Sequence, residues 1–191
     1  MPQATLFDDG PQVLIEDAGS GVRYWPGFID EQTAADWFST LRDTIHWQSE
    51  RRPMYDRVVD VPRLLAGFAL LDAALPAVLR DAGTRVRDKL DVEFTHVGLN
   101  FYRDGRDSVA PHNDKLHSIV VGKPIALLSL GAARRMDIRD KLPPKVTRCI
   151  KLQPGSLLVM SHDSQKHYDH GIPKTKQTVG ARISVVFRVR P

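Results

Sequence analysis

The sequence predicts an α+β fold in which N-terminal helices support a β-rich core, either a sandwich or a jelly roll. Apolar residues recur at helical spacing in two segments of the first half, and from residue 92 onward short β-rich runs alternate with turn signals. No repeat and no Pro/Gly/Ser-rich linker divides the 191 residues. We therefore expect one domain, 1–191, with residues 1–91 as an N-terminal extension and residues 92–191 as the core.

The first half predicts a strand and two helices. The stretch "VRYWPGFI" at residues 22–29 reads as a strand that ends in a turn, and Asp30 can then cap a helix over residues 31–45. An apolar stripe predicts a second helix over about residues 73–90. Between them, residues 47–71 read as irregular, because "RRP" and "VPR" break any regular period.

The second half predicts strands separated by turns. "QPGS" lies between two apolar runs and indicates a hairpin turn. The β-rich runs are "EFTHVGLNFY" (93–102), "PIALLSLG" (124–131), "RRMDIRD" (134–140), "RCIKLQPGSLLVMS" (148–161) and "RISVVFRVR" (182–190).

Composition is that of an ordinary globular protein, with 42% hydrophobic and 26% charged residues. No apolar run approaches the roughly 20 residues of a membrane helix, and the N-terminal residues lack the pattern of a signal peptide. A single cysteine, Cys149, excludes an internal disulfide, so we expect a cytoplasmic location. The net charge of +4 suits a polyanionic partner, although many basic proteins of this size bind no nucleic acid.

The segment "APHNDK" places His112 and Asp114 two residues apart, so on an extended chain both point to the same side. A third ligand could come from His162, His167 or His170, which follow the "SLLVM" run. Two histidines and one carboxylate leave three coordination positions open, as in non-heme Fe(II) oxygenases. The alternative is a surface loop with a hydrogen-bonded histidine, since H-x-D also occurs by chance.

The run "RISVVFR" carries Arg182 and Arg188 on the same strand face, about 20 Å apart at about 3.3 Å per residue. Guanidinium groups match carboxylates, so two long side chains leaning together could hold a short dicarboxylate. Next to an Fe(II) site, that dicarboxylate would be 2-oxoglutarate. The alternative is a pair of surface arginines that protect an edge strand from aggregation.

Residues 96–190 resemble the AlkB family of Fe(II)- and 2-oxoglutarate-dependent dioxygenases. The matching motifs are N-x-Y, H-x-D, a distal histidine and R-x-x-x-x-x-R, in "NFYRDGRDSVAPHND", "PIALLSLGAAR", "GSLLVMSHDSQKHYDHGIP" and "RISVVFR". In the first half, "YWPGFID" and "DVPR" match more loosely. The resemblance implies a double-stranded β-helix (jelly roll) core supported by the N-terminal helices.

The resemblance implies His112, Asp114 and His170 as the iron ligands. His170 is preferred over His167 because the ligand of this family directly precedes a stretch like "GIP". His162 and His167 would then be structural or lie behind the ligands.

The resemblance also implies the groups that bind 2-oxoglutarate. Asn100 and Tyr102 match the N-x-Y motif, Arg182 would pair with the distal carboxylate, and Arg188 would lie near the other end. Ser184 stands on the cofactor face where an asparagine is common.

The implied reaction uses Fe(II), 2-oxoglutarate and dioxygen to remove N-alkyl groups from bases such as 1-methyladenine and 3-methylcytosine in DNA or RNA, with release of formaldehyde. Repair members often carry an acidic pair after H-x-D, but here "KLH" follows, and the substrate lid before the second helix looks short. These departures keep two alternatives open: an oxygenase acting on a protein or small molecule, and a non-catalytic nucleic-acid-binding relative.

The substrate is expected to be alkylated nucleic acid, with a single strand as one candidate form, and the chain is expected to be a monomer. Trp47 could contact the substrate or simply pack the core, and "QATLF" at residues 3–7 faintly resembles a sliding-clamp-binding peptide. Candidate substrate contacts are Arg51, Arg52, Tyr55, Arg63, Lys115 and His117. Candidate phosphate contacts near the mouth are Arg103, Arg106, Lys115, Lys123, Arg134 and Arg135.

Overall fold

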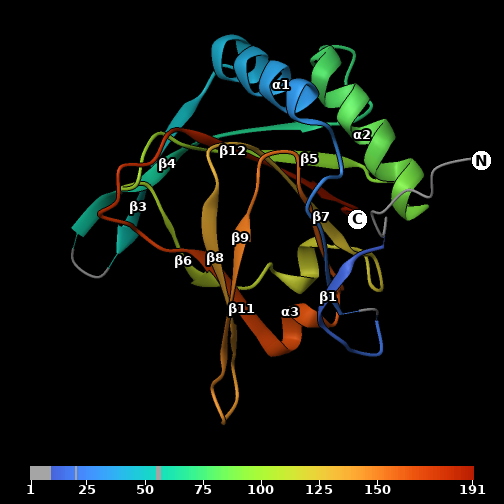
Figure 1. The fold of residues 1–191 in the computed structure, drawn as a ribbon, viewed down its shortest axis with the longest axis vertical. Coiled ribbons are helices and arrows are strands. Elements are labelled where there is room, and N and C mark those ends of the chain that lie inside the picture. The colour runs from blue at the N-terminus through green and yellow to red at the C-terminus, as the bar shows by residue number, and fades with distance from the viewer. Residues whose placement is uncertain (1–9, 20, 55–56) are drawn as a thin grey trace, which may run out of the picture.

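A computed structural model describes residues 10–19, 21–54 and 57–191, except for the side chains of 52–54 and 57–59. Within these residues the core consists of two antiparallel sheets, as Figure 1 shows. The larger sheet has the order β1 (Gln12–Ile15), β2 (Val22–Trp25), β10 (Leu157–Met160), β7 (Ile125–Gly131), β12 (Arg182–Arg188), β5 (His96–Tyr102), β4 (Arg57–Ala69) and β3 (Gln48–Met54). The smaller sheet has the order β6 (Val109–His112), β11 (Tyr168–Ile172), β8 (Arg134–Asp140) and β9 (Thr147–Leu152). The predicted jelly-roll fold is thereby confirmed.

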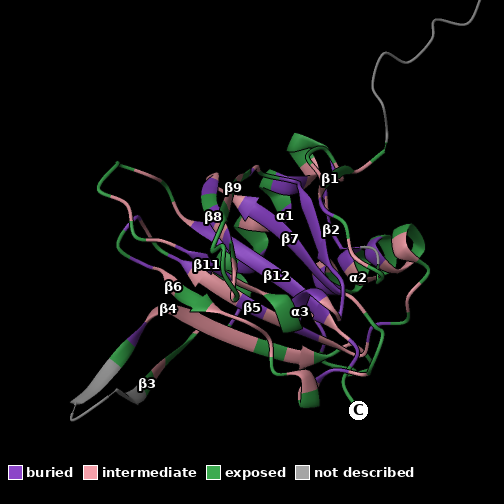
Figure 2. Cartoon of the chain, turned by 90° about the horizontal axis from the view of Figure 1, so that it is seen from below, coloured by how far each residue is buried: buried purple, intermediate pink, exposed green. Residues whose placement is uncertain are grey.

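Two apolar layers follow from the alternation of side chains along the central strands. Ile183, Val185 and Phe187 of β12 are buried in the layer beneath the helices, whereas Val186 belongs to the layer between the two sheets. Figure 2 shows how buried residues concentrate in the central strands. Every second residue of β12 therefore faces the interior between the sheets, where a site can be enclosed.

Two helices, α1 (Glu31–Thr44) and α2 (Ala77–Leu90), cover the outer face of the larger sheet (Figure 1). Asp30 caps α1 as predicted, because its carboxylate accepts a hydrogen bond from the main-chain N–H of Thr33 at 2.9 Å. The second helix begins at Ala77, a few residues later than expected, directly after Pro76. A short helix, α3 (Ser164–His167), and a 3-10 turn, η1 (Leu116–Ser118), lie in the connections. Within the described residues, no helix combines the length and apolar character that crossing a membrane requires.

The prediction that residues 47–71 are irregular is wrong. The segment contains both β3 and β4, which pair with each other, and β4 pairs with β5 in the register Leu64 to Phe101. Apolar residues are frequent in the β4 part of the segment, as in "LLAGFALL" (64–71), but they follow one another without the alternation of a half-buried strand. The strands are defined by pairing, of β3 with β4 and of β4 with β5. Pro53 is tolerated because β3 is the edge strand, where a missing N–H breaks no ladder.

The "QPGS" segment is a tight turn, with the N–H of Ser156 bonded to the carbonyl of Gln153, but it does not close a hairpin. It connects β9 of the smaller sheet to β10 of the larger one, and these two strands belong to different ladders. Gly155 adopts φ 75°, and a Cβ there would lie 2.5 Å from the carbonyl of Ile29. The turn thus passes the chain between the sheets, a long-range outcome that turn chemistry alone does not encode.

Candidate active site

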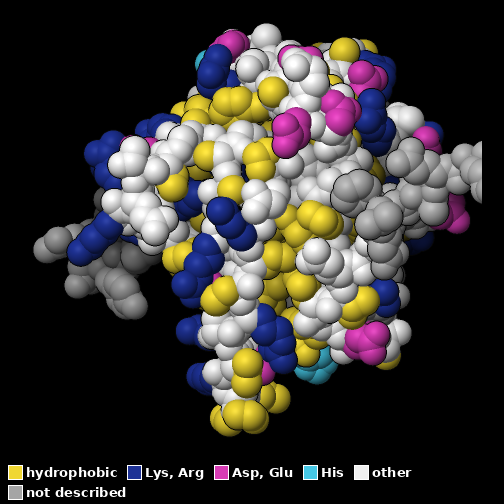
Figure 3. All heavy atoms as spheres, viewed as in Figure 1, with side chains coloured by type: hydrophobic (Ala, Val, Ile, Leu, Met, Phe, Trp, Pro, Cys, Tyr) yellow, Lys and Arg dark blue, Asp and Glu magenta, His cyan; other side chains and the backbone are white. Residues whose placement is uncertain are grey.

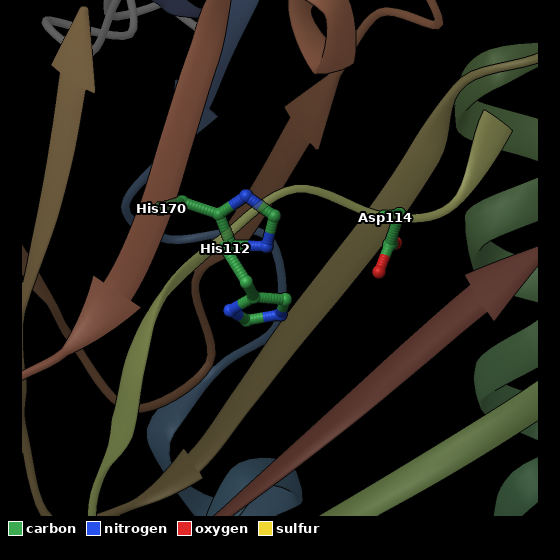
Figure 4. Close-up of side chains that lie close together, drawn as sticks. All are labelled: His112, Asp114 and His170. Carbon is green, nitrogen blue, oxygen red and sulfur yellow. The ribbon is translucent and has the colours of Figure 1, made fainter. Parts of the chain in front are cut away.

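Three potential metal ligands meet at the edge of the smaller sheet. His112 ends β6, His170 lies in β11, and Asp114 follows β6 by two residues. One ligand atom of each lies within 4.8 Å of the others. The two histidines are direct partners across the β6–β11 ladder, with ring centroids 4.6 Å apart. Figure 4 shows the two rings next to each other, with Asp114 on a neighbouring stretch of chain. The sheet register therefore positions both imidazoles.

The two histidines are suited to bind a metal in their neutral form. His170 is 7% exposed, and burial, reinforced by nearby His112, lowers its pKa to about 4. Nδ1 of His112 lies 2.9 Å from the carbonyl of Ala110, which favours a proton on Nδ1 and leaves Nε2 as the electron-pair donor. Neutral imidazole is the form that ligates metals.

Asp114 is held by an arginine and a glutamine. Arg188 donates from Nε and Nη2 to the two carboxylate oxygens at 2.9 and 3.1 Å. The main-chain N–H of Asp114 donates to Oε1 of Gln165 at 2.9 Å. A bidentate guanidinium fixes the plane of a carboxylate, so the Asp114 side chain has a defined orientation.

The two arginines of β12 do not lie on an edge strand, so that alternative is wrong. β12 is paired on both sides, with β5 and with β7. Arg182 and Arg188 face the interior between the sheets, as the alternation with the buried Ile183 and Phe187 requires.

Arg182 is a fully buried cation with spare donors. It donates from Nη2 to the hydroxyl of Ser129 at 2.9 Å, and its guanidinium lies 5.2 Å from the ring centroid of Tyr102. Its Nε and Nη1 have no hydrogen-bond partner among the residues that the structure describes. Burial lowers its pKa to about 10, so Arg182 is still charged at neutral pH. A buried charge with unpaired donors is suited to bind an anion.

The neighbouring strands supply the walls around Arg182. Ser184 is buried and lies between Asn100 of β5 and Ser129 of β7 in the ladder register. Tyr102 is also buried, and burial raises the pKa of its hydroxyl. Asn100 accepts a hydrogen bond from Nε of Arg63 at 2.8 Å. The structure thus brings the candidate 2-oxoglutarate residues to one face of the larger sheet.

The candidate substrate residues are more scattered. Lys115 and His117 are exposed on the segment after Asp114, and Arg51 of β3 forms an exposed ion pair with Asp60. Arg63 lies against Asn100 instead of projecting into solvent. The side chain of Arg52 and the whole of Tyr55 lie outside the described residues, as does the "QATLF" segment.

Trp47 packs against Phe101 with ring centroids 5.0 Å apart, which supports its interpretation as a core-packing residue. Two further histidines had been candidates for the third ligand. His162 is buried but lies outside the three-residue cluster, and His167 is exposed.

The expectation that Arg134 contacts phosphate is wrong, because this side chain is 3% exposed. Its guanidinium donates to the main-chain carbonyls of Asp104, Asp107 and Pro173 at 2.9 Å, and lies 5.8 Å from the Tyr102 ring. The signal was present in the sequence: Arg134 alternates in phase with Met136 and Ile138, so it lies on the buried face of β8. Gln165, also buried, had no comparable signal.

Comparison with known proteins supports this arrangement. The model of the family "2OG-Fe(II) oxygenase superfamily" matches residues 71–188, which include every candidate metal and 2-oxoglutarate residue. The bovine DNA oxidative demethylase ALKBH2 is 35% identical over 115 residues, which cover 54% of this chain and 41% of that protein. The human alpha-ketoglutarate-dependent dioxygenase alkB homolog 3 is 30% identical over 189 residues, 88% of this chain and 66% of that protein. The chain thus spans less than two thirds of these relatives.

Solved structures share the fold. The 2-oxoglutarate-dependent epimerase SnoN superposes with a TM-score of 0.64 at 16% identity, covering 90% of this chain and 81% of that one. OsALKBH1 superposes with a TM-score of 0.63 at 16% identity, covering 94% of this chain and all of that one.

The residues present fit the groups that this superfamily uses. A His/Asp/His donor set suits Fe(II) and leaves positions for a chelating co-substrate and dioxygen. The unpaired nitrogens of the buried Arg182 suit one carboxylate of 2-oxoglutarate. The matched family model, the relatives and this donor set agree: the chain belongs to the 2OG-Fe(II) oxygenase superfamily, and within it to the AlkB family that its motifs resemble.

Proposed function

We propose that this chain is an Fe(II)- and 2-oxoglutarate-dependent demethylase that removes N-alkyl groups from bases such as 1-methyladenine and 3-methylcytosine in DNA or RNA. The observation that carries the proposal is the buried, incompletely paired Arg182 in the same interior as the His112/Asp114/His170 cluster. The names of the relatives support the choice of substrate, because one is a DNA oxidative demethylase.

In this proposal His112, Asp114 and His170 hold the iron, and Arg188 orients the Asp114 carboxylate toward it. When bound, the iron and 2-oxoglutarate supply the oxidation of the N-alkyl group by dioxygen, and formaldehyde leaves from a methylated base. The protein's part is to orient these groups and exclude water from the space between the sheets.

Arg182 and Ser129 bind the distal carboxylate of 2-oxoglutarate in this proposal, with Tyr102 forming one wall. Asn100, already bonded to Arg63, and Ser184 border the co-substrate on β5 and β12. A low-dielectric pocket strengthens the charge pair once the anion has entered.

Nucleic-acid contact is proposed for Arg51, Arg52, Tyr55, Arg63, Lys115 and His117. Lys115 and His117 suit this role because they are exposed beside the metal cluster. We also propose that residues 1–191 form one domain, which acts in the cytoplasm as a monomer. Accessible single strands are proposed as the better substrate. Contact of "QATLF" with a sliding clamp is proposed from the likeness of these five residues to a clamp-binding peptide.

The test is a demethylation assay on purified protein with Fe(II), 2-oxoglutarate and ascorbate. Short single- and double-stranded DNA and RNA carrying 1-methyladenine or 3-methylcytosine are analysed by mass spectrometry, and succinate is measured alongside. We expect loss of the methyl mass only when 2-oxoglutarate is present, with the fastest loss from single strands.

A second candidate function, oxygenation of a protein or small molecule, is favoured by one observation: Lys115 and His117 stand where repair members often carry an acidic pair. Succinate formation without demethylation of any of these oligonucleotides would support it. Absence of succinate under all conditions would instead support a non-catalytic nucleic-acid-binding protein.

A further inference from the structure

Gln165 is a buried polar residue on a polar surface segment. Its side chain is 1% exposed, whereas the next two residues of α3, Lys166 and His167, are exposed. A buried amide is costly unless its oxygen and nitrogen are both hydrogen-bonded, so its partners indicate why it is there.

The amide oxygen of Gln165 accepts the main-chain N–H of Asp114 at 2.9 Å, across 51 positions of sequence. Its amide nitrogen donates to the hydroxyl of Ser164 at 3.1 Å and lies 3.9 Å from the sulfur of Met160. The shortest of these three contacts is the one to Asp114, a candidate metal ligand. Gln165 itself supplies no atom to the His112/Asp114/His170 cluster.

The three candidate ligands are not held in the same way. His112 and His170 face each other across the β6–β11 ladder, so main-chain pairing fixes their separation. β6 ends at His112, and Asp114 therefore lies beyond the ladder. Its carboxylate is fixed by Arg188, and the main chain that carries it is fixed by Gln165.

Gln165 also belongs to the segment that carries His170. Helix α3 leads directly into β11, so His170 follows Gln165, whose amide holds Asp114, by only five positions. Lys141, the first residue after β8, holds the same segment, because its Nζ donates to the carbonyl of Gln165 at 2.6 Å. One anchored stretch of chain thus sets the position of His170 and of the main chain at Asp114.

We infer that Gln165 is a positioning residue for the metal centre: its amide oxygen keeps the Asp114 carboxylate within reach of the two imidazoles. This inference rests on the proposed metal ligands but not on the proposed substrate. Partners that orient metal ligands without touching the metal typically contribute 10- to 100-fold in affinity.

The test measures metal affinity in the absence of substrate. Co(II) is titrated into the full chain, with its visible absorption as the readout, for wild type, Gln165→Met, Gln165→Glu and Asp114→Ala. Methionine keeps the length of the side chain but removes the acceptor, whereas glutamate keeps an acceptor oxygen. Gln153→Met, a matched change in the β9–β10 turn away from the cluster, is the control.

We expect Gln165→Met to bind Co(II) at least about 10-fold more weakly than wild type and Gln153→Met. Gln165→Glu should recover part of that loss, and metal-free Gln165→Met should remain folded at the titration temperature by circular dichroism. Recovery in Gln165→Glu separates positioning from packing, because a role in packing alone would not depend on an acceptor oxygen.

Wild-type Co(II) affinity in Gln165→Met, alongside a clear loss in Asp114→Ala, would overturn the role of Gln165 and leave the metal centre standing. An equal loss in Gln165→Met and Gln165→Glu would also overturn it. Undiminished affinity in Asp114→Ala would overturn the metal centre and this inference together. None of these outcomes depends on whether the protein demethylates nucleic acid.

Discussion

At the scale of single residues, the site is built from polar groups whose burial is costly in the absence of ligands. Arg182 is fully buried with two nitrogens unpaired among the described residues, and His170 is held neutral by its surroundings. Both are costs to the free protein, since a buried charge or titratable group is stabilised only when it is paired. Residues that destabilise the fold while lining a pocket are expected where function requires them.

Arg182→Met should therefore weaken the binding of 2-oxoglutarate without unfolding the protein, so that turnover is largely lost at 2-oxoglutarate concentrations near the wild-type KM. Burial lowers the pKa of Arg182 to about 10, because a charged side chain in the interior is unfavourable. Replacing it with an apolar side chain of similar length removes that cost, so the free energy of unfolding of the metal-free protein should stay equal or rise. The KM for 2-oxoglutarate should rise about 100-fold, because a hydrogen-bonded charge pair is lost.

The measurements are succinate formation against 2-oxoglutarate concentration, Co(II) titration and urea unfolding. Co(II) affinity should match that of wild type, because Arg182 contacts Ser129 and Tyr102, whereas Asp114 is held by Arg188. Loss of metal binding in Arg182→Met, or an unchanged KM, would contradict the assigned role.

His170 predicts a pH dependence of stability in the metal-free protein. Its pKa is about 4 in the folded state and about 6.5 in an unfolded chain, so between these values the unfolded state binds more protons. Stability therefore falls as pH drops from about 6.5 to about 4, by up to about 3 kcal/mol from this group.

Urea unfolding with a chelator at pH 7 and pH 5 should show about 2 kcal/mol of this loss in wild type, because at pH 5 His170 is protonated in the unfolded chain and still neutral in the folded one. His170→Gln should lose less stability over the same interval, and the exposed His167→Gln should behave like wild type. Identical pH dependence in all three proteins would rule out a depressed pKa at His170.

At the scale of elements, the β6–β11 ladder brings the two imidazoles together. The register is irregular between His170 and Ile172, and Gly171 lies at that point. A Cβ on Gly171 would lie 2.9 Å from the carbonyl oxygen of Val109 and 3.0 Å from the nitrogen of Pro111, both main-chain atoms of β6. The close approach of these strands thus depends on the absence of a side chain.

Gly171→Ala should separate β6 from β11 and weaken metal binding, on the order of 10-fold for Co(II), because His112 moves relative to His170. The control is Gly67→Ala in β4, where the nearest contact of a Cβ is an ordinary 3.7 Å to the carbonyl of Val97. Co(II) titration of both variants checks this. Equal affinities would show that β6 adjusts without moving the ligand.

At the scale of the whole molecule, the sequence predicted what depends on local pattern and motif. Three motifs were sufficient to predict that the metal ligands and the two arginines belong to one site. They are the H-x-D pair, the distal histidine and the alternation of "RISVVFR". The β3–β4 strands were missed because "RRP" and "VPR" interrupt any period in the sequence, whereas in the structure β3 pairs with β4 and β4 pairs with β5. The sheet exchange at "QPGS" and the burial of Gln165 likewise follow from contacts between distant segments, which a single sequence does not display.

The overall charge predicts that nucleic-acid binding, as proposed, weakens steeply with salt. The chain carries a net charge of +4, and Figure 3 shows Lys and Arg side chains gathered along the arm formed by β8 and β9. Each phosphate neutralised on a single strand contributes about −0.7 to the slope of log affinity against log salt. Four such contacts give a slope of about −3, or a loss of about 50-fold between 50 and 200 mM salt.

Fluorescence anisotropy of a labelled single-stranded oligonucleotide across this salt range measures the slope. Lys115→Gln, beside the metal cluster, should make the slope shallower by about 0.7 if this lysine contacts a phosphate. Lys89→Gln is the matched control, because Lys89 lies on α2, on the outer face of the larger sheet. A salt-independent affinity in the wild-type protein would instead indicate a substrate without a phosphate backbone, since only a polyanion releases counterions when it is bound.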